Sequence, residues 1–353
     1  MRKLDLIYYR PGDYSLVPNG SIVVLSDNDQ LDNADGAMLA SRNIRVCVLT
    51  ADNETYALNP DAWMSYLAGL RAKIQRKGLT LAGVMVSEEW WDRVNAPDVM
   101  SWGCMAGLDM WQRKRKLLPL VRRMVAQAKV AFQGTPIVGV ESRWNENEAS
   151  GAGLWYPYYD TDIVGLDAYL SGKGFDWLGT PPLRSGTDGA MLEKFGKEVT
   201  WMLTGSPDGR VTGALKIGRP VWLVAQAFYY QGGEPWSVAP DPNQLQWWWH
   251  IAQGHAGVTG LGFFCCQSAP GVVGLDALPA LALSVASIVR ENGMSPVVAP
   301  TPVPVPTPAP TPAPVPTPPP VPTRRLLWTT EHYSDGSIRV LDARGEQAYI
   351  GAA

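Results

Sequence analysis

The fold class is decided by residues 81–91, LAGVMVSEEWW, in which seven apolar or small residues lead directly into two glutamates and two tryptophans. A later stretch, residues 221–228, VWLVAQAF, has the same form but reaches an amide instead of a carboxylate. Continuous apolar runs of this kind are typical of strands that are buried on both faces of a parallel sheet. The two stretches therefore predict buried parallel strands with polar and aromatic side chains at their carboxyl ends.

Apolar segments of the same kind recur along the first 295 residues and alternate with helix signals. The predicted strands cover residues 4–9, 21–25, 44–50, 81–87, 136–141, 162–167, 221–226 and 258–265. No clear helix separates the first two, so the number of strands is inferred from the alternation elsewhere. Eight strands alternating with helices over this length predict an α/β fold, a (β/α)8 TIM barrel.

Two of the predicted helices have strong start signals. Asn59-Pro60 and Asp241-Pro242 each combine an N-cap residue with proline at the first helical position. The first of these helices carries a stripe of apolar residues at helical spacing and should end at Gly78. Two further helices are predicted over residues 117–132 and 278–289. A basic run, residues 113–116, and the pair at 122–123 are interpreted as the solvated face of one helix.

The chain divides by composition into a barrel domain over residues 1–295, a linker over 296–323 and a small β tail over 324–353. Fourteen of the 28 linker residues are proline, which predicts extended polyproline II. The tail shows strand signals at 326–330, 337–341 and 347–350. Because a small hairpin is marginally stable in water, we expect the tail to pair with a partner protein or with another copy of itself.

Composition excludes several functions. A net charge of −3 gives no electrostatic footprint for nucleic acid or for an anionic membrane. The start of the chain has no apolar leader, and no 18-residue apolar stretch predicts a membrane span. We therefore expect a soluble protein with no nucleic-acid partner and no membrane insertion.

Metal, disulfide and cofactor chemistry find no support in the sequence. The four cysteines, Cys47, Cys104, Cys265 and Cys266, lack the spacing of a disulfide framework or a metal site and are interpreted as small buried hydrophobic residues. The three histidines have no metal-ligand spacing, and neither a phosphate-binding loop nor a nucleophile elbow is present. We expect no cofactor and no metal. The 15 tryptophans and 13 tyrosines instead favour sugar binding, because aromatic faces stack on sugar rings.

In a barrel of this type, functional side chains lie at the carboxyl ends of the strands. The candidate catalytic residues there are carboxylates: Glu89, Glu88, Glu141 and Asp167. The candidate sugar-binding residues are aromatic or amide side chains: Tyr8, Trp90, Trp144, Tyr169, Gln226 and Tyr229. Structural roles stay open for the carboxylates. The two adjacent glutamates could begin a helix, Glu141 could pair with Arg143 or Arg122, and Asp167 could cap a loop.

Four segments in this order, SEEW at 87–90, DIVGLDAY at 162–169, PVWLVAQAF at 220–228 and WWHIAQGHAGVTGLGFF at 248–264, resemble the glycoside hydrolase superfamily of (β/α)8 barrels. The resemblance covers residues 1–293. It implies that Glu89 is the acid/base on the fourth strand, with Glu88 before it and Trp90 where proline usually stands. It also implies a nucleophile at the end of the seventh strand, where this chain has Gln226. An amide can neither form a glycosyl ester nor act as a base.

Two functions follow as hypotheses. The first is an O-glycosyl hydrolase acting on a polysaccharide or cell-surface glycan, with a second carboxylate as partner of Glu89. The second is a catalytically inactive barrel of the same ancestry that serves as a carbohydrate-binding or structural module, which Gln226 favours. The proline-rich linker, the absence of a leader and the free cysteines fit a bacteriophage virion tail component; otherwise we expect a cytoplasmic or non-classically released protein.

Overall fold

The computed structural model describes residues 1–12, 14–51, 53–88, 97–141, 160–167, 199–201, 203–205, 207, 213–231 and 239–296. It also describes the backbone of three strands within 329–352. The chain forms two compact units, Met1–Ala299 and Pro300–Ala353. The predicted linker lies outside the described residues, apart from Pro296 at its start.

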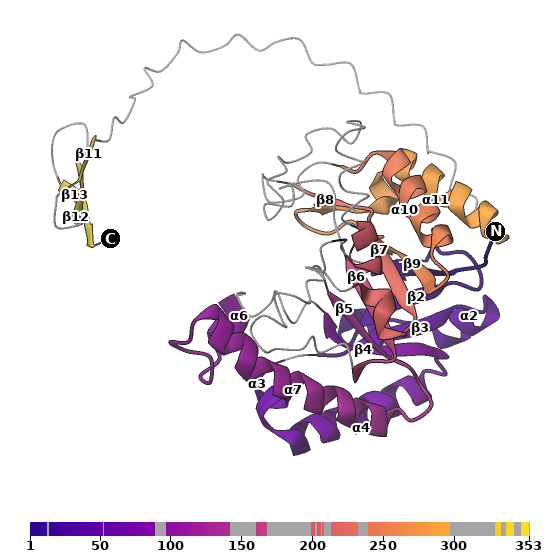
Figure 1. Ribbon diagram of the computed structural model, residues 1–353, viewed down its shortest axis with the longest axis horizontal. Helices are drawn as coiled ribbons and strands as arrows, with labels where there is room; N and C mark the ends of the chain where they lie inside the picture. Colours follow the sequence, from indigo (N-terminus) through magenta and orange to yellow (C-terminus); the bar gives the residue numbers. More distant parts are fainter. Residues whose placement is uncertain are drawn as a thin grey trace, which may run out of the picture. The chain divides into compact units, whose positions relative to one another are not determined.

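Eight strands of the first unit close into a parallel barrel (Figure 1), which confirms the predicted fold class. In order around the barrel, these strands are β1 (Asp5–Tyr9), β2 (Ile22–Ser26), β3 (Arg45–Leu49), β4 (Leu81–Glu88), β5 (Ile137–Glu141), β6 (Ile163–Asp167), β7 (Val221–Gln226) and β9 (Val258–Phe264). β9 pairs with β1 in parallel and closes the circle. Each strand lies within two residues of its predicted bounds.

The helices follow the predicted caps. The Asn59 side chain accepts hydrogen bonds from the backbone N–H groups of Asp61 and Ala62 and begins α4 (Pro60–Arg76). The predicted stripe of α4 is buried in full: Trp63, Leu67, Leu70 and Ile74. Asp241 caps α10 (Pro242–Gly254). The remaining helices and 3-10 turns are α1 (Asp29–Asp32), α2 (Gly36–Ser41), α3 (Glu54–Leu58), α6 (Pro97–Met100), α7 (Met110–Ala131), η3 (Ala214–Ile217), η4 (Leu275–Ala277) and α11 (Pro279–Glu291).

Helix α7 corrects two predictions. It starts at Met110 rather than at residue 117, because Asp109 and Gln112 form a capping box seven residues before the predicted start. Its basic run is not entirely solvated, since Lys114 is only 3% exposed. The Lys114 ammonium lies 5.0 Å from the centre of the Trp111 ring, one turn earlier. The aliphatic stem of a lysine on the face that also carries Leu117 and Leu118 packs with the core.

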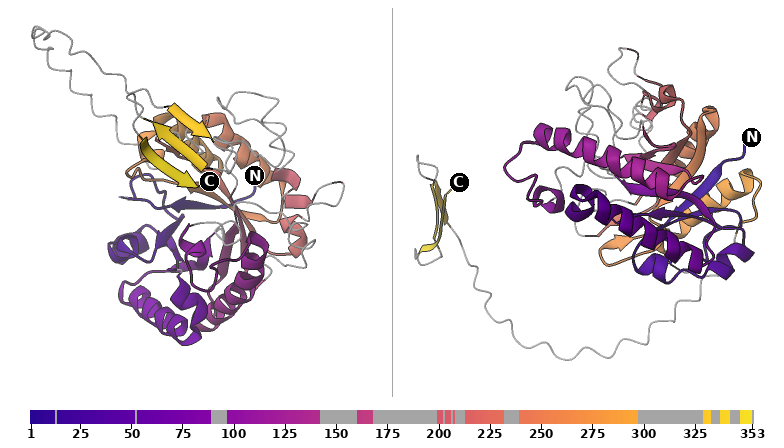
Figure 2. Two further views of the ribbon diagram at one scale, coloured as in Figure 1. Left: turned by 90° about the vertical axis from the view of Figure 1, so that its left-hand side faces the viewer. Right: turned by 90° about the horizontal axis from the view of Figure 1, so that it is seen from below.

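The helices pack in pairs around the barrel. Helices α4 and α7 lie side by side, and so do α10 and α11 (Figure 2). Among the described residues, no helix is both long and apolar enough to cross a membrane.

Two separate hydrophobic clusters divide the strand residues by the face from which their side chains project. The smaller cluster fills the barrel interior and includes Ile7, Tyr9, Val138, Val140 and Trp222. The larger cluster lies between the strands and the helices. Since successive side chains of a strand alternate between faces, membership of a cluster tells which residues of each strand face the interior.

The amino end of the barrel is held by hydrogen bonds and ion pairs. Asn292, after α11, accepts a hydrogen bond from the Leu4 N–H at 2.9 Å and donates one to the Leu4 carbonyl at 2.8 Å. The Arg2 guanidinium donates to the carbonyls of Ala252, His255 and Ala256 at the end of α10. Two ion pairs connect separate elements: Arg45 of β3 pairs with Asp5 of β1 at 2.6 Å, and Lys129 of α7 pairs with Asp162, before β6, at 2.8 Å.

The second unit contains one antiparallel sheet of three strands, in the order β11 (Thr329–His332), β12 (Ser337–Leu341) and β13 (Gln347–Ala352). Thr330 pairs with Val340, which pairs with Tyr349. The first of these strands begins three residues later than its predicted start at residue 326. The pairing of this tail with another protein or another copy stays a prediction.

Candidate functional site at the carboxyl ends of the strands

The ends of β4, β5 and β6 lie at one level of the barrel. Glu88 pairs with Val140, Glu141 with Leu166, and Asp167 with Val224. Strands of an eight-stranded barrel of this type are tilted, so that register partners descend by about eight residues in one circuit, or about one residue per strand. The residue level with Glu88 is therefore Glu141, and the residue level with Glu141 is Asp167.

Asp167 and Gln226 fall on the interior face of their strands. Ile163 packs against the interior cluster, and alternation places Asp167 in the same row. Trp222 and Val224 belong to that cluster, which places Gln226 in their row. Asp167 is 4% exposed and Gln226 is 2% exposed. The two neighbouring strands β6 and β7 thus end in a buried carboxylate and a buried amide on the same face.

The amide of Gln226 is oriented by its own strand end. Its Nε2 donates a hydrogen bond of 3.0 Å to the carbonyl of Phe228. The side chain is therefore held at the carboxyl end of the barrel by a neutral donor–acceptor pair. A glutamate in the same place would have no proton to donate when ionised.

Glu141 is fully buried but lies in the other row of β5. Val138 and Val140 belong to the interior cluster, whereas Ile137 belongs to the cluster under the helices. Alternation along β5 therefore places Glu141 in the row of Ile137. Its suggested structural partner Arg122 forms an ion pair with Asp160, with Nε and Oδ2 2.5 Å apart. The other suggested partner, Arg143, lies outside the described residues.

A β-bulge shifts the end of β4. Met85 pairs with Val138 and Glu88 with Val140, so three steps along β4 match two along β5. The extra residue brings the backbone of Glu88 opposite a residue of the interior cluster. Bulges are frequent next to active sites, where they change the direction of a side chain. Four predicted site residues lie outside the described residues: Glu89, Trp90, Trp144 and Tyr169.

The structure does not bring Tyr8 into the interior row with the other candidates. Tyr8 is fully buried under the helices, and its ring centre lies 5.4 Å from that of Phe263. Burial raises the pKa of its phenol well above the ordinary value. The interior position belongs to the next residue, Tyr9, whose ring lies 5.4 Å from Phe264. Alternation along β1 shows that Tyr8 and Tyr9 face opposite sides, but the sequence alone does not tell which side is interior.

The ring of Phe264, at the end of β9, contacts a second aromatic ring and a guanidinium group. Its ring centre lies 5.3 Å from that of Phe228 and 5.3 Å from the guanidinium carbon of Arg10. Arg10 is exposed and has a positive φ of 51°, a conformation that turns the chain away from β1. The contact of Arg10 with Phe264 could not be predicted from the sequence.

Tyr229 lies in a small sheet above the barrel. The two-residue strand β8 (Tyr229–Tyr230) pairs antiparallel with β10 (Val272–Val273), and Tyr229 is opposite Val273. Tyr229 is half-buried. This sheet joins the loop after β7 to the loop after β9, so that Tyr229 belongs to the rim rather than to the interior row.

Asp27, at the end of β2, has a structural role. Its carboxylate forms an ion pair of 2.9 Å with Lys73 of α4, and Lys73 also pairs with Asp32 at 2.9 Å. Hydrogen bonds to the two carboxylates raise the pKa of Lys73. Among the described residues, no group of three or more histidine, cysteine or acidic side chains is arranged to hold a metal ion.

Comparison with known proteins finds solved structures of similar fold but no relative in sequence. No protein-family model matches the chain, and no curated protein matches it in sequence. The barrel is similar to a GH5_18 variant from Streptomyces cattleya in complex with Manβ1-4GlcNAc. That match has 13% identity and a TM-score of 0.50, and covers 82% of this chain and 81% of the other.

A second solved structure similar to the chain is the GH128 (subgroup I) endo-β-1,3-glucanase from Amycolatopsis mediterranei in complex with laminaritriose. Identity is 10%, the match covers 81% of this chain and 99% of the other, and the TM-score is 0.44. At such low identities the similarity shows the fold alone. The chain has the (β/α)8-barrel fold, and its structural neighbours are glycoside hydrolases.

Proposed function

We propose that the barrel is a glycoside hydrolase that cleaves a polysaccharide or cell-surface glycan by carboxylate acid–base chemistry. The observation that carries the proposal is Asp167, a buried carboxylate in the interior row at the end of β6, level with the acidic end of β4. Most glycoside hydrolases use two carboxyl groups, one on each side of the scissile bond. The described residues supply one of them, and the acidic sequence after residue 87 supplies the other.

The roles are assigned by position. The glutamate pair at the end of β4 provides the general acid, Glu89 by the resemblance with Glu88 before it, and protonates the glycosidic oxygen. Asp167 provides the second carboxylate, which either activates water or attacks the anomeric carbon. Glu141 is the alternative partner, but its row on β5 makes it less suited to contact a sugar in the barrel mouth. Gln226, Tyr229 and Trp90 contact the sugar, with Trp144 and Tyr169.

The test is cleavage of a panel of soluble polysaccharides by the full chain, with release of reducing ends as the readout. We expect Glu89→Gln to abolish cleavage but to keep polysaccharide binding, because the amide preserves shape and removes the transferable proton. Glu88→Gln tests which of the two adjacent glutamates acts. Normal cleavage by both variants would refute the assignment.

Gln226 favours a second function, a barrel that binds glycans without cleaving them. An amide stands where the resemblance expects a nucleophile, and its hydrogen bond to the Phe228 carbonyl gives it a structural role. In that case the chain binds a polysaccharide of the panel, releases no reducing ends, and keeps its affinity when Asp167 is changed to asparagine.

We also propose that the protein is a component of a bacteriophage virion, where a tail-associated barrel would meet cell-surface glycans. The support is organisation: a proline-rich run stands between the barrel and a separate three-stranded unit. Antibody detection of the chain in purified particles tests this. Its absence from the particles would refute the placement and would leave the hydrolase proposal unaffected.

A further inference from the structure

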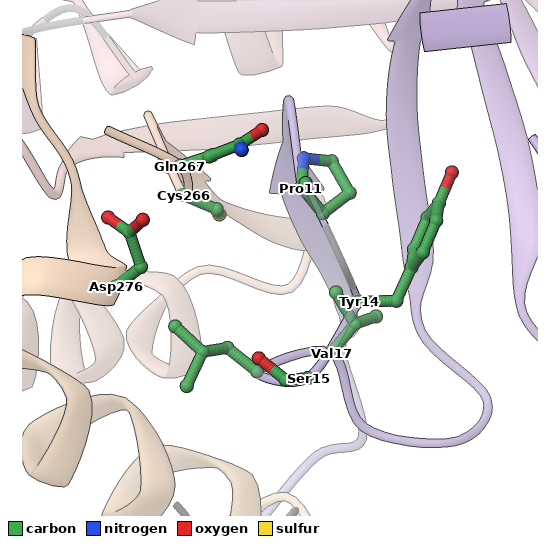
Figure 3. A pocket seen from close by; sticks show the side chains of 9 residues that line it. Pro11, Tyr14, Ser15, Val17, Cys266, Gln267 and Asp276 are labelled. Carbon is green, nitrogen blue, oxygen red and sulfur yellow. The ribbon is translucent and has the colours of Figure 1, made fainter. Parts of the chain in front are cut away.

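A cavity of about 340 Å³ lies between the loop after β1 and the loop after β9 (Figure 3). Asp276 and Gln267 line it on one side, and Pro11 and Val17 line it on the other. This volume is at the lower end of the range of small-molecule binding sites.

Hydrogen bonds to backbone groups hold both loops that form the cavity. Arg42 donates to the carbonyls of Tyr14 and Val17 and fixes the first loop. In the second loop, the Asp276 N–H donates to the Cys266 carbonyl at 3.0 Å, and the Cys266 N–H donates to the Tyr9 carbonyl at 2.9 Å. These hydrogen bonds fix the backbone that lines the cavity, which reduces the entropy that binding must overcome.

The Asp276 carboxylate is oriented by one neighbour. Its Oδ1 accepts hydrogen bonds from the Ser268 N–H at 2.9 Å and from the Ser268 hydroxyl at 2.6 Å. Within the described part of the chain, Oδ2 accepts no hydrogen bond, and the residue is exposed. A carboxylate that is fixed through one oxygen can accept from ligand hydroxyls through the other, and such charge-assisted bonds are short and strong.

Gln267 is positioned by a glycine. A Cβ atom at Gly12 would lie 2.2 Å from Gln267 Cδ and 2.4 Å from each terminal atom of its amide. The amide therefore rests directly on the backbone of Gly12. It offers one acceptor and two donors at the cavity, a pairing that suits hydroxyl groups, which both donate and accept.

The charge of the lining restricts the ligand. Asp276 is its one charged residue among the described residues, and no basic side chain lines the cavity. An anionic ligand would be repelled. Pro11, Leu16 and Val17 provide an apolar wall, so the ligand should have an apolar face as well as hydroxyl groups. A neutral pyranose ring combines the two properties.

We infer that this cavity is a second carbohydrate-binding site, which holds one neutral sugar residue against Asp276 and Gln267. It lies at the ends of β1 and β9, whereas the proposed catalytic carboxylates lie at the ends of β4 and β6, across the barrel mouth. The site rests on its own geometry. The identification of the ligand as a sugar rests in addition on the proposed function, since a glycan at the mouth could extend a sugar unit to this cavity.

The test is binding of N-acetylglucosamine, a neutral sugar, to the full chain. A saturation-transfer NMR titration measures the dissociation constant, and glucosamine and glucuronate serve as the cationic and anionic comparisons. We expect saturable millimolar binding of the neutral sugar and none of glucuronate. Asp276→Ala should raise the dissociation constant about tenfold or more, since it removes the charged acceptor. Gly12→Ala should raise it several-fold, because the new methyl group displaces the flexible end of Gln267 and leaves the backbone in place.

Matched controls separate the cavity from the mouth. Gly69→Ala places a methyl group in open space on α4, and Asp61→Ala removes an exposed carboxylate from the same helix. Both should leave binding unchanged. The inference fails if no saturable binding is seen, if Asp276→Ala has no effect, or if glucosamine binds more than tenfold more tightly than the neutral sugar. Binding lost in Asp167→Asn but kept in Asp276→Ala would place the sugar in the mouth and refute the cavity while supporting the proposed function.

Discussion

The two ends of the barrel are built from the same strands but use their polar residues differently. At the amino end, polar side chains are paired with partners that hold elements together: Asn292 with Leu4, Lys129 with Asp162, and Arg2 with the end of α10. At the carboxyl end, Asp167 and Gln226 are buried at the ends of β6 and β7, and Phe228 after β7 packs against Phe264 at the end of β9. This difference is typical of barrel enzymes, in which one end provides stability and the other provides the site.

The comparison predicts opposite consequences for substitutions at the two ends. Burial of a carboxylate is unfavourable for folding unless its environment compensates, so replacing it at a functional site often costs activity more than stability. Removal of a paired group at the amino end should do the reverse. The following variants test this division.

The largest effect is expected for Asp167→Asn. Loss of a carboxylate that acts in proton transfer or attack should reduce polysaccharide hydrolysis by about 10³-fold, while the thermal midpoint stays the same or rises. The matched control is Asp162→Asn, just before the amino end of the same strand, which should keep its hydrolysis rate. If the two variants hydrolyse equally well, the ends of β6 do not differ in function as proposed.

Asn292→Ala should be the most destabilising of these variants. The change leaves the buried N–H and carbonyl of Leu4 without their partner, at a cost of about 3 kcal/mol in the free energy of unfolding. Denaturant titration measures this loss. Below the unfolding transition, the hydrolysis rate should match that of the unaltered chain; a rate loss in fully folded protein would mean that the amino end also serves the site.

Gln226→Glu tests the carboxyl end from the other side. The substitution removes the donor to the Phe228 carbonyl and places an acceptor against it, which should cost about 1–2 kcal/mol in unfolding free energy. Under the proposal that Asp167 is the second carboxylate, we expect no gain in hydrolysis. An increase of tenfold or more would show that the amide is what limits the site and would assign the nucleophile position to β7.

The smallest expected effect is the contribution of His255, at the amino end, to the pH dependence of stability. Burial, and then the nearby Arg2 guanidinium, lower the pKa of His255 below its ordinary value of 6.5. Above pH 6.5 the imidazole is neutral in both the folded and the unfolded chain. As the pH falls below 6.5, the unfolded chain binds a proton that the folded chain does not, so stability decreases toward the lower folded pKa.

His255→Gln should therefore flatten the dependence of the thermal midpoint on pH below 6.5. The backbone carbonyl that accepts from Arg2 is kept in this variant. A pH dependence identical to that of the unaltered chain would show that His255 does not carry the effect.

The barrel was predictable because its strands are continuous apolar runs and its main helices have strong caps. The stretch at 81–91 and the Asn59-Pro60 start both specify local structure through side-chain chemistry alone. The alternation of side chains along β1 did not identify its interior face, because the residues of this strand are apolar on both faces. The choice between Tyr8 and Tyr9 depended on which cluster each joins, and this is a property of the closed barrel.

The candidate site was predictable in its position but only partly in its members. The expected strand ends agree with the structure for Asp167 and Gln226, which are the last residues of β6 and β7, but their burial was not predicted. The burial of Lys114 and the bulge before Glu88 arise from packing between elements and leave no signal in sequence spacing. The cavity at Asp276 joins loops some 260 residues apart, and only the pairing of β1 with β9 brings them together.

The most direct test of a carbohydrate-cleaving carboxyl end is a crystal structure of the Asp167→Asn variant with a bound oligosaccharide that the unaltered chain cleaves. We predict a glycosidic oxygen within hydrogen-bonding reach of the carboxyl group of Glu89 or Glu88, with residue 167 on the other side of the sugar and a separation of about 5–10 Å between the two groups. An oligosaccharide bound away from the ends of β4 and β6, or a larger separation across the cleft, would contradict it.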